Sequence, residues 1–157
     1  MLLLLVPALA FARPVQAGTS SGTLTVKATV SANCTVANAT LDFGAYDPLV
    51  NNATALLPRD ADTTMSVSCT KGSTPVTITI PLTRTMTGTP GGETLTYQLY
   101  SDISRSVPFV DTVPGFVLGP FTSKSTPQVL HIYGRIPGGQ DVTIASYLGT
   151  ILVTANF

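Results

Sequence analysis

The sequence predicts a single all-β domain of 157 residues, a β-sandwich with Greek-key connections. Threonine and β-branched residues are abundant, whereas Glu93 is the single glutamate and there are three lysines, so long amphipathic helices are disfavoured. Segments in which apolar and polar residues alternate recur along the chain, separated by clusters of Gly, Pro, Asn and Asp. No strand pattern alternates with a helical pattern, which argues against a parallel α/β sheet.

Residues 1–17 are predicted to be a secretory signal peptide. They contain the apolar run Leu2–Ala12, which is too short to span a bilayer, and end on the small-residue site Val15-Gln16-Ala17. The alternative is an N-terminal core strand. Export to an oxidising compartment would favour an intramolecular disulfide between Cys34 and Cys69, the alternative being two unpaired buried thiols.

The clearest alternation follows at Gly22–Val30, which is predicted to be a strand. One side of it carries Leu24, Val26, Ala28 and Val30, and the other carries Thr23, Thr25, Lys27 and Thr29. Ala45–Asp60, rich in Asn, Asp and Pro, is expected to be a loop. Further strands are expected at Thr40–Phe43, Thr64–Thr70, Val76–Leu82, Thr94–Tyr100, Gln128–Ile136 and Tyr147–Phe157. The last of these places Tyr147, Gly149, Ile151, Val153, Ala155 and Phe157 on one face.

Four prolines interrupt the apolar stretch Val107–Pro127, so short edge strands and partly buried irregular segments are expected there. The alternative is an exposed adhesive surface. Charged residues make up 10% of the chain and cancel to zero, or to about −1 if Arg13 is removed with the signal peptide. This balance offers no basic patch for nucleic acid, and the sparse charge favours a subunit that is packed in an assembly.

The sequence contains no recognisable catalytic pattern, and we expect no enzyme activity, no cofactor and no metal site. The single histidine, His131, has no second histidine or cysteine pair with which to build a zinc site. Asp60 and Asp62 share one face of an extended chain, an arrangement compatible with calcium, but turn chemistry explains aspartates in loops more simply. Nucleophile motifs and phosphate-binding glycine loops are missing.

The strand Gly22–Val30 can be interpreted in two ways. It can be an ordinary first strand of its own sheet, or it can complete the sandwich of a neighbouring molecule by donor-strand complementation. The pattern of the residues alone leaves both interpretations open.

A family resemblance bears on this choice. The segments Leu24–Val36 (LTVKATVSANCTV), Leu41–Gly44 (LDFG), Tyr97–Asp102 (YQLYSD), Ile132–Pro137 (IYGRIP) and Tyr147–Phe157 (YLGTILVTANF) resemble the spore coat protein U family, which includes subunits of archaic chaperone–usher pili. The resemblance implies an incomplete immunoglobulin-like sandwich that lacks its last strand and is completed by donor-strand exchange. It also implies residues 18–33 as the donor region and residues 34–157 as the sandwich.

The same resemblance implies the working residues and the partners. The donor face would be Leu24, Val26, Ala28 and Val30, and the acceptor edge, which a chaperone also contacts, would be Ile151, Val153, Ala155 and Phe157. The partners would be neighbouring pilus subunits, a periplasmic chaperone and an outer-membrane usher, and the product a surface fimbria that supports adhesion and biofilm formation. A spore or cyst coat protein and a stand-alone adhesive module remain the alternatives.

Overall fold

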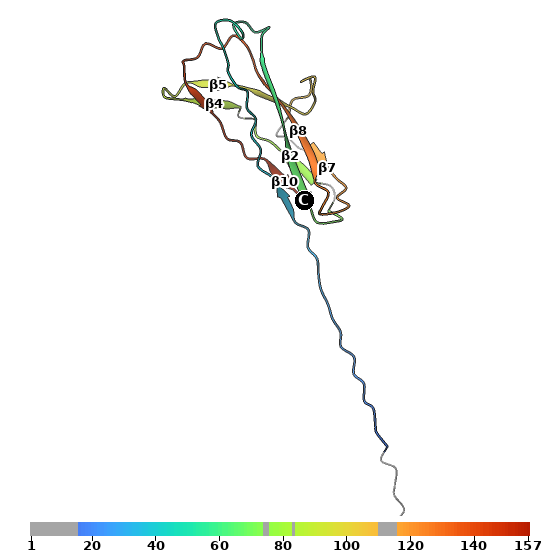
Figure 1. Cartoon of the computed structure of the whole chain (residues 1–157). Coiled ribbons are helices and arrows are strands. Elements are labelled where there is room, and N and C mark those ends of the chain that lie inside the picture. The colour runs from blue at the N-terminus through green and yellow to red at the C-terminus, as the bar shows by residue number, and fades with distance from the viewer. Residues whose placement is uncertain (1–15, 74–75, 83, 110–115) are drawn as a thin grey trace, which may run out of the picture. The chain divides into compact units, whose positions relative to one another are not determined.

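The computed structural model describes residues 16–73, 76–82, 84–109 and 116–157. The chain divides into two units, the segment that ends at Val30 and a body of Ser31–Phe157, and each is described by itself. The body is all-β, which confirms the predicted fold class (Figure 1). Its strands are β1 Cys34–Val36, β2 Arg59–Cys69, β3 Val76–Thr79, β4 Thr85–Thr89, β5 Thr94–Thr96, β6 Gln98–Tyr100, β7 Phe116–Leu118, β8 Gln128–Ile136, β9 Ser146–Leu148 and β10 Thr154–Asn156.

The largest sheet has the strand order β1-β2-β8-β6. Its centre is the antiparallel ladder of β2 and β8, which runs from the pair Arg59 and Ile136 to the pair Val67 and Gln128. We call the end of the body near Arg59 and Ile136 the distal end, and the end where β2 finishes at Cys69 the base. Figure 1 shows β2 and β8 side by side along the body.

Two three-stranded sheets, β10-β3-β7 and β5-β4-β9, complete the sandwich. Strands β3 and β8 alternate buried with less buried side chains, as expected for strands with one face against a core. The sheets enclose one hydrophobic cluster, within which the largest fully buried side chains are Phe121, Ile78, Ile80, Leu99, Leu130, Ile136, Val67 and Val76. Side chains of this size each contribute about 1.5–3 kcal/mol when buried.

A disulfide joins Cys34 to Cys69 at the base, with an S–S distance of 2.02 Å. The two residues are also directly opposite each other in the β1–β2 ladder. The beginning of the body is further attached there by Thr70, whose Oγ1 accepts a hydrogen bond from the Asn33 amide at 3.1 Å. The same hydroxyl lies 3.4 Å from the carbonyl oxygen of Ser31.

Several predicted strands differ from those in the structure. Gln128–Ile136 coincides with β8, but Thr94–Tyr100 divides at Tyr97 because β5 pairs with β4 whereas β6 pairs with β8. The strand β4 was missed, since its sequence Thr-Met-Thr-Gly-Thr carries almost no apolar alternation. The predicted loop Ala45–Asp60 ends two residues too late, because β2 already begins at Arg59.

Asp60 and Asp62 therefore lie in β2 and not in a turn. The Asp60 carboxylate accepts hydrogen bonds from Arg135 Nε and Nη2 at 2.7 and 2.8 Å. These bonds hold the pKa of Asp60 below its usual value. No group of three or more potential metal-ligating side chains occurs among the described residues.

The proline-rich stretch Val107–Pro127 is mostly folded into the body where it is described. β7 pairs with β3, and Phe109, Leu118 and Phe121 are buried, which supports the partly buried interpretation. Phe116 and Val117 stay partly exposed, and Phe116 contacts the Phe109 ring edge-on. Residues 110–115 lie outside the described part.

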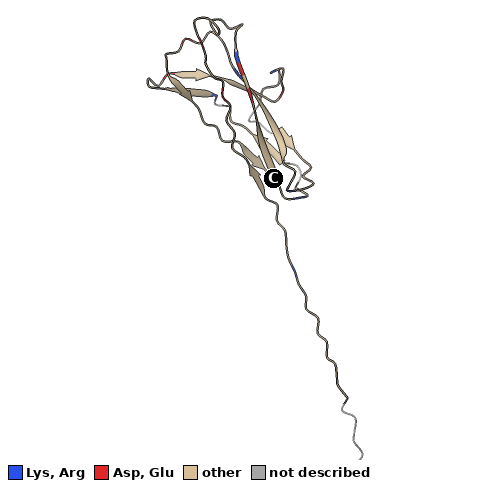
Figure 2. Cartoon of the chain, viewed as in Figure 1, with Lys and Arg blue, Asp and Glu red and all other residues tan. Residues whose placement is uncertain are grey.

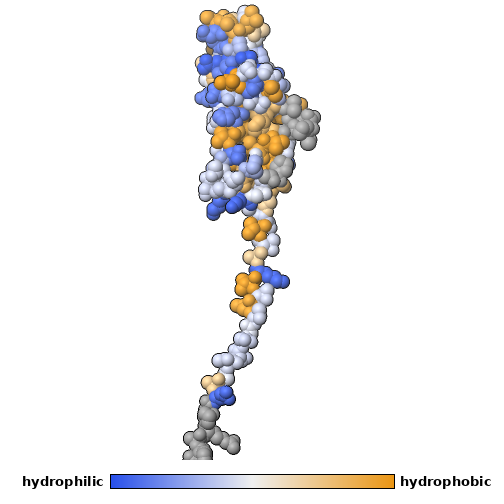
Figure 3. Space-filling model, turned by 90° about the vertical axis from the view of Figure 1, so that its right-hand side faces the viewer, coloured by the Kyte–Doolittle hydropathy of each residue, from blue (hydrophilic) through white to orange (hydrophobic). Residues whose placement is uncertain are grey.

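The N-terminal segment is described from residue 16, so the predicted signal peptide falls almost wholly outside the described residues. Gly22–Val30 forms no strand, contrary to the prediction, because no ladder partner is present. Leu24, Val26 and Val30 are 86%, 82% and 83% exposed, and Ala28 is exposed as well. Hydrophobic side chains recur along this segment in Figure 3.

Candidate functional site

Two stretches of the body have strand-like sequences but no strand partner. The predicted strand Thr40–Phe43 is in no ladder, and the predicted strand Tyr147–Phe157 is reduced to β9 and β10 with the unpaired residues Gly149–Val153 between them. No backbone–backbone hydrogen bond joins residues 38–43 or 150–153 to any other described residue. Free backbone donors and acceptors at a sheet edge are a template for an added strand.

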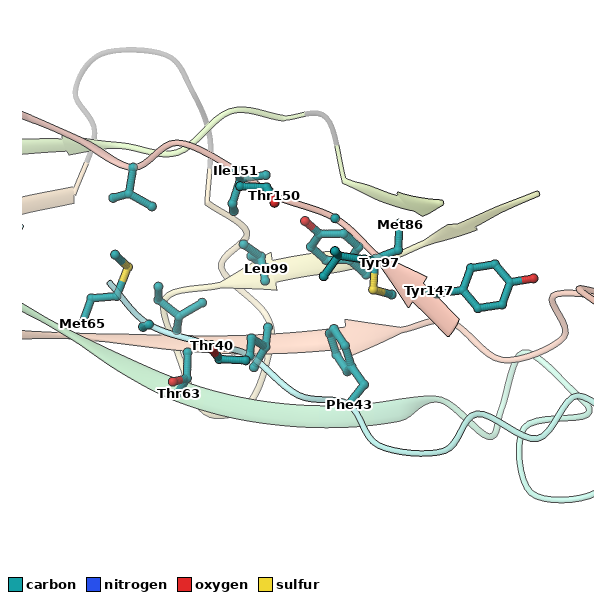
Figure 4. A pocket seen from close by; sticks show the side chains of 16 residues that line it. Thr40, Phe43, Thr63, Met65, Met86, Tyr97, Leu99, Tyr147, Thr150 and Ile151 are labelled. Atoms are coloured by element: carbon teal, nitrogen blue, oxygen red, sulfur yellow. The ribbon is translucent and has the colours of Figure 1, made fainter. Parts of the chain in front are cut away.

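An apolar groove separates these two edges. Its first part is a cavity of about 330 Å³. One rim is Ala39–Phe43 and the other is Tyr147–Val153, and the floor consists of Met65, Met86, Tyr97, Leu99 and Ile132. Figure 4 shows Phe43, Tyr97, Leu99 and Ile151 directed into the space between the rims. A groove with such a lining exposes core side chains that an inserted strand could cover.

The Ala39–Phe43 rim is positioned by a glycine in the sheet beneath it. A Cβ atom at Gly134 in β8 would lie 2.6 Å from Leu41 Cδ2 and 2.7 Å from Phe43 Cζ. Only a glycine therefore lets both side chains pack directly on β8. Leu41 is partly buried and Phe43 is 7% exposed, so this rim is anchored by its side chains while its backbone has no strand partner.

The groove continues toward the distal end of the body. A second cavity of about 570 Å³ shares Leu41, Phe43, Met86 and Tyr147 with the first. Its additional walls are Tyr46 and Pro48 on one side and Val142–Ser146 on the other. The edge from Val142 to Val153 is about 36 Å long when extended.

Charge plays little part in the groove. No Asp, Glu, Lys, Arg or His lines the first cavity among the described residues, and Asp42 is the one charged group in the wall of the second. Burial raises the pKa of Tyr97, which keeps its phenol neutral in the groove floor. Charged residues are sparse over the whole body in Figure 2. The groove therefore suits an apolar strand face.

The predicted acceptor-edge residues fall into two groups. Ile151 and Val153 line the groove. Ala155 lies in β10 opposite Ile78 of β3, and Phe157 is 59% exposed and lines neither cavity. The opposite rim and the floor were not predicted as parts of this site, because the alternation of Leu41 and Phe43 does not reveal that their strand lacks a partner.

The single histidine is a surface residue. His131 is exposed on β8 and stacks on Tyr133 with 6.3 Å between the ring centroids. It has no part in the groove.

Three comparisons with known proteins agree with this architecture. The model of the Spore Coat Protein U domain matches residues 20–154. The chain is 32% identical over 161 residues to Protein U of Myxococcus xanthus, covering 92% of this chain and 88% of the relative.

The fold also resembles a solved structure. A chain of the CsuC–CsuE chaperone–tip adhesion subunit pre-assembly complex, from archaic chaperone–usher Csu pili of Acinetobacter baumannii, superimposes with a TM-score of 0.54 at 16% identity. The match covers 82% of this chain but 41% of that chain, so it supports the fold. With the match of the domain model over most of its length, this chain belongs to the Spore Coat Protein U domain family.

Proposed function

We propose that this chain is a structural subunit of a secreted surface fibre, and that copies are linked by insertion of residues 18–30 of one copy into the groove of the next. The single observation that carries the proposal is the apolar groove between two unpaired edges, 38–43 and 150–153. The chain itself contains a matching element, since Leu24, Val26, Ala28 and Val30 form one apolar face on an exposed segment without a ladder.

Residues 18–30 match the groove in length, and their burial there would be favourable. Residues 18–30 extend over about 40 Å, close to the length of the groove edge. Leu24, Val26 and Val30 would each contribute about 1.5–3 kcal/mol on burial, and the inserted backbone would pair with both edges. Interlocked copies of this kind resist dissociation kinetically.

The direction of insertion decides what kind of assembly forms. The edge Gly149–Val153 runs from the distal end toward the base, and each copy's own segment joins its body at Ser31 in the base. A donor that runs antiparallel to this edge places its body at the distal end of the acceptor, and repetition gives an open head-to-tail fibre. The reverse direction brings two bases together and closes a reciprocal pair. We therefore assign the antiparallel direction to the fibre.

Periplasmic export, a chaperone that holds the groove, an outer-membrane usher, and a role in adhesion and biofilm formation complete this proposal. The structural similarity to a chain of a chaperone–subunit complex from chaperone–usher Csu pili supports it. A coat role is the second candidate, favoured by the match of residues 20–154 to the Spore Coat Protein U domain. Genes for a chaperone and an usher beside this one would favour the pilus.

The test compares two substitutions on opposite faces of the same strand. Val26→Asp puts an unpaired carboxylate into the apolar groove, a cost of several kcal/mol, whereas Thr25→Asp places the same charge on the outer face. The unmodified chain and Thr25→Asp should form a ladder of oligomers that survives detergent without heating. Val26→Asp should run as a monomer. If both variants polymerise equally, strand exchange is wrong.

A further inference from the structure

The two ends of the body differ in charge and in apolar exposure. Lys71 and Lys124, two of the three lysines of the chain, lie together at the base, on a hollow of about 460 Å³. Asn33, Cys69 and Thr70 also line this hollow, and no acidic residue does among the described ones. The base is therefore a concave surface with positive charge.

The distal end carries carboxylates and exposed leucines. Asp47, Glu93 and Asp141 belong to the loops there: Glu93 accepts a hydrogen bond from the Thr143 amide at 2.7 Å, and Asp141 follows the turn after β8. Arg59, a cation at this end, donates to the Phe43 carbonyl oxygen at 2.6 Å. Four apolar side chains project from the loop Asp47–Leu57, with exposed fractions of 85% for Leu49, 70% for Val50, 90% for Leu56 and 46% for Leu57.

This distal loop, Asp47–Leu57, is held in a fixed shape in spite of its exposure. The Asp47 carboxylate accepts from the amides of Leu49, Val50 and Asn51 at 3.0, 3.2 and 3.3 Å, which lowers the pKa of Asp47. The buried Asn52 side chain donates to the Leu57 carbonyl oxygen at 2.9 Å.

The loop also rests on the turn that follows β8. A Cβ atom at Gly138 would lie 2.1 Å from Thr54 O, so the loop backbone packs directly on this glycine. Gly139 donates to the Asn52 carbonyl oxygen at 2.7 Å. Ordered, exposed leucines on such a support are suited to docking.

Strand exchange brings these two ends together. A donor that runs toward the distal end places its Val30 beside the acceptor's distal loop, and Ser31 and Asn33 are attached to Thr70 at the donor's own base. Asn33, which lines the hollow, is three residues after Val30, a distance of at most about 10 Å. The lysine-bearing base of one copy must therefore lie next to the carboxylates and leucines of another.

We propose that consecutive copies also dock body to body, with the distal loop of the acceptor and the carboxylates Asp47, Glu93 and Asp141 seated on the base hollow of the donor around Lys71 and Lys124. This inference rests on the proposed strand exchange and adds a second contact at each junction. The contact is heterologous, so it repeats along a fibre without closing. The opposite charges of the base and the distal end favour this contact over one between two bases or two distal ends.

Cross-linking in mixed fibres tests the contact. Fibres are grown from equal amounts of ¹⁴N- and ¹⁵N-labelled chains, treated with a zero-length carbodiimide, digested and analysed by mass spectrometry. We expect mixed-isotope peptides that join Lys71 or Lys124 to Asp47, Glu93 or Asp141. Because Lys124→Glu removes one of the two reactive amines, the readout is the yield of the cross-links from Lys71, which this charge reversal should lower at least about fivefold. Leu49→Ser with Leu56→Ser should lower the same yield to a similar extent. Ile103→Ser, a change at a side chain that is 74% exposed elsewhere, serves as the control.

The outcomes separate this inference from the proposed function. If the oligomers resist detergent but yield no mixed-isotope cross-links, the docking contact is wrong and strand exchange remains supported. A yield that Lys124→Glu and the leucine changes leave equal to that of Ile103→Ser would also overturn it. If no ladder forms at all, both proposals fail.

Discussion

The β2–β8 ladder and the groove are built from similar residues but are completed in different ways. In the ladder, Arg59 to Val67 pair with Ile136 to Gln128, and Val67 and Leu130 are fully buried. Around the groove, Ile151 and Val153 have the same alternation but keep an unpaired backbone and partly exposed side chains. Alternation thus shows which face of a strand needs to be buried, but it does not show whether the same chain supplies the partner.

The largest expected effect comes from closing the groove within one chain. Residues 18–30 attached after Phe157 through a four-residue linker should return antiparallel to Gly149–Val153, as in a hairpin. Burial of three large side chains and pairing of two edges should add on the order of 5 kcal/mol, which raises the melting temperature by roughly 15 °C. Differential scanning calorimetry and size-exclusion chromatography measure it, against residues 31–157 alone.

The control is the same graft with Val26→Asp, which should return the melting temperature to that of residues 31–157. Should residues 31–157 be a stable monomer that the graft leaves unchanged, no groove is available. A gain that needs a linker long enough to recross the groove would show that the direction is reversed.

Removal of the disulfide tests the part of the body that lies outside the groove. Cys34→Ser with Cys69→Ser opens a loop with a sequence separation of 35 residues. The chain-entropy model gives a loss of about 3.8 kcal/mol in the free energy of unfolding. Urea denaturation measures it, and the loss should be equal with and without the graft because the bridge lies outside the groove. A loss that appears only in the grafted chain would contradict this placement.

A pair of truncations sharpens the comparison between ladder and groove. Leu130→Ala removes a fully buried side chain from β8 and should cost about 2–5 kcal/mol with or without the graft. Ile151→Ala removes a rim side chain and should cost under about 1 kcal/mol in the body alone but about 2 kcal/mol in the grafted chain. Equal costs for Ile151→Ala in the two contexts would show that this residue does not contact the donor.

Much of the fold followed from the residues themselves. The strand β8 was predicted to the residue, since Leu130, Ile132 and Ile136 alternate with exposed positions and Pro137 ends the run. β4 could not be found, because a strand without apolar alternation is recognised by its ladder partners β5 and β9 and not by its own sequence.

The groove was predictable only in part. Ile151 and Val153 were named as an edge from the tail pattern and the family resemblance. The rim at Leu41 and Phe43 was predicted as a strand, but whether a strand is paired depends on the whole arrangement of the body, which local patterns do not contain. The floor unites residues of four strands that lie far apart in the sequence, Met65, Met86, Leu99 and Ile132.

The smallest expected effect is the loss of stability at low pH. The hydrogen bonds from Arg135 keep the pKa of Asp60 below its ordinary value of 3.8 in the folded body. The resulting stabilisation is present above the pKa of the unfolded chain and is lost as the pH falls below about 4 through the folded pKa. Because the pair is about one-third exposed, Asp60→Asn should cost under about 1 kcal/mol at pH 7 and almost nothing at pH 2. Urea melts at the two pH values measure it, and equal losses would contradict the ion pair.

The disulfide has a mechanical consequence in a fibre linked in this way. Tension on a donor segment enters its body at Ser31 and reaches Cys34 within three residues. From there the covalent bridge transmits it to Cys69, at the end of the longest strand, and the β2–β8 ladder carries it to the distal end. Strands paired antiparallel along the direction of pull are loaded in shear, so many hydrogen bonds resist together. The bridge places the strongest part of the sandwich in series with the fibre and relieves the short strand β1 of the load.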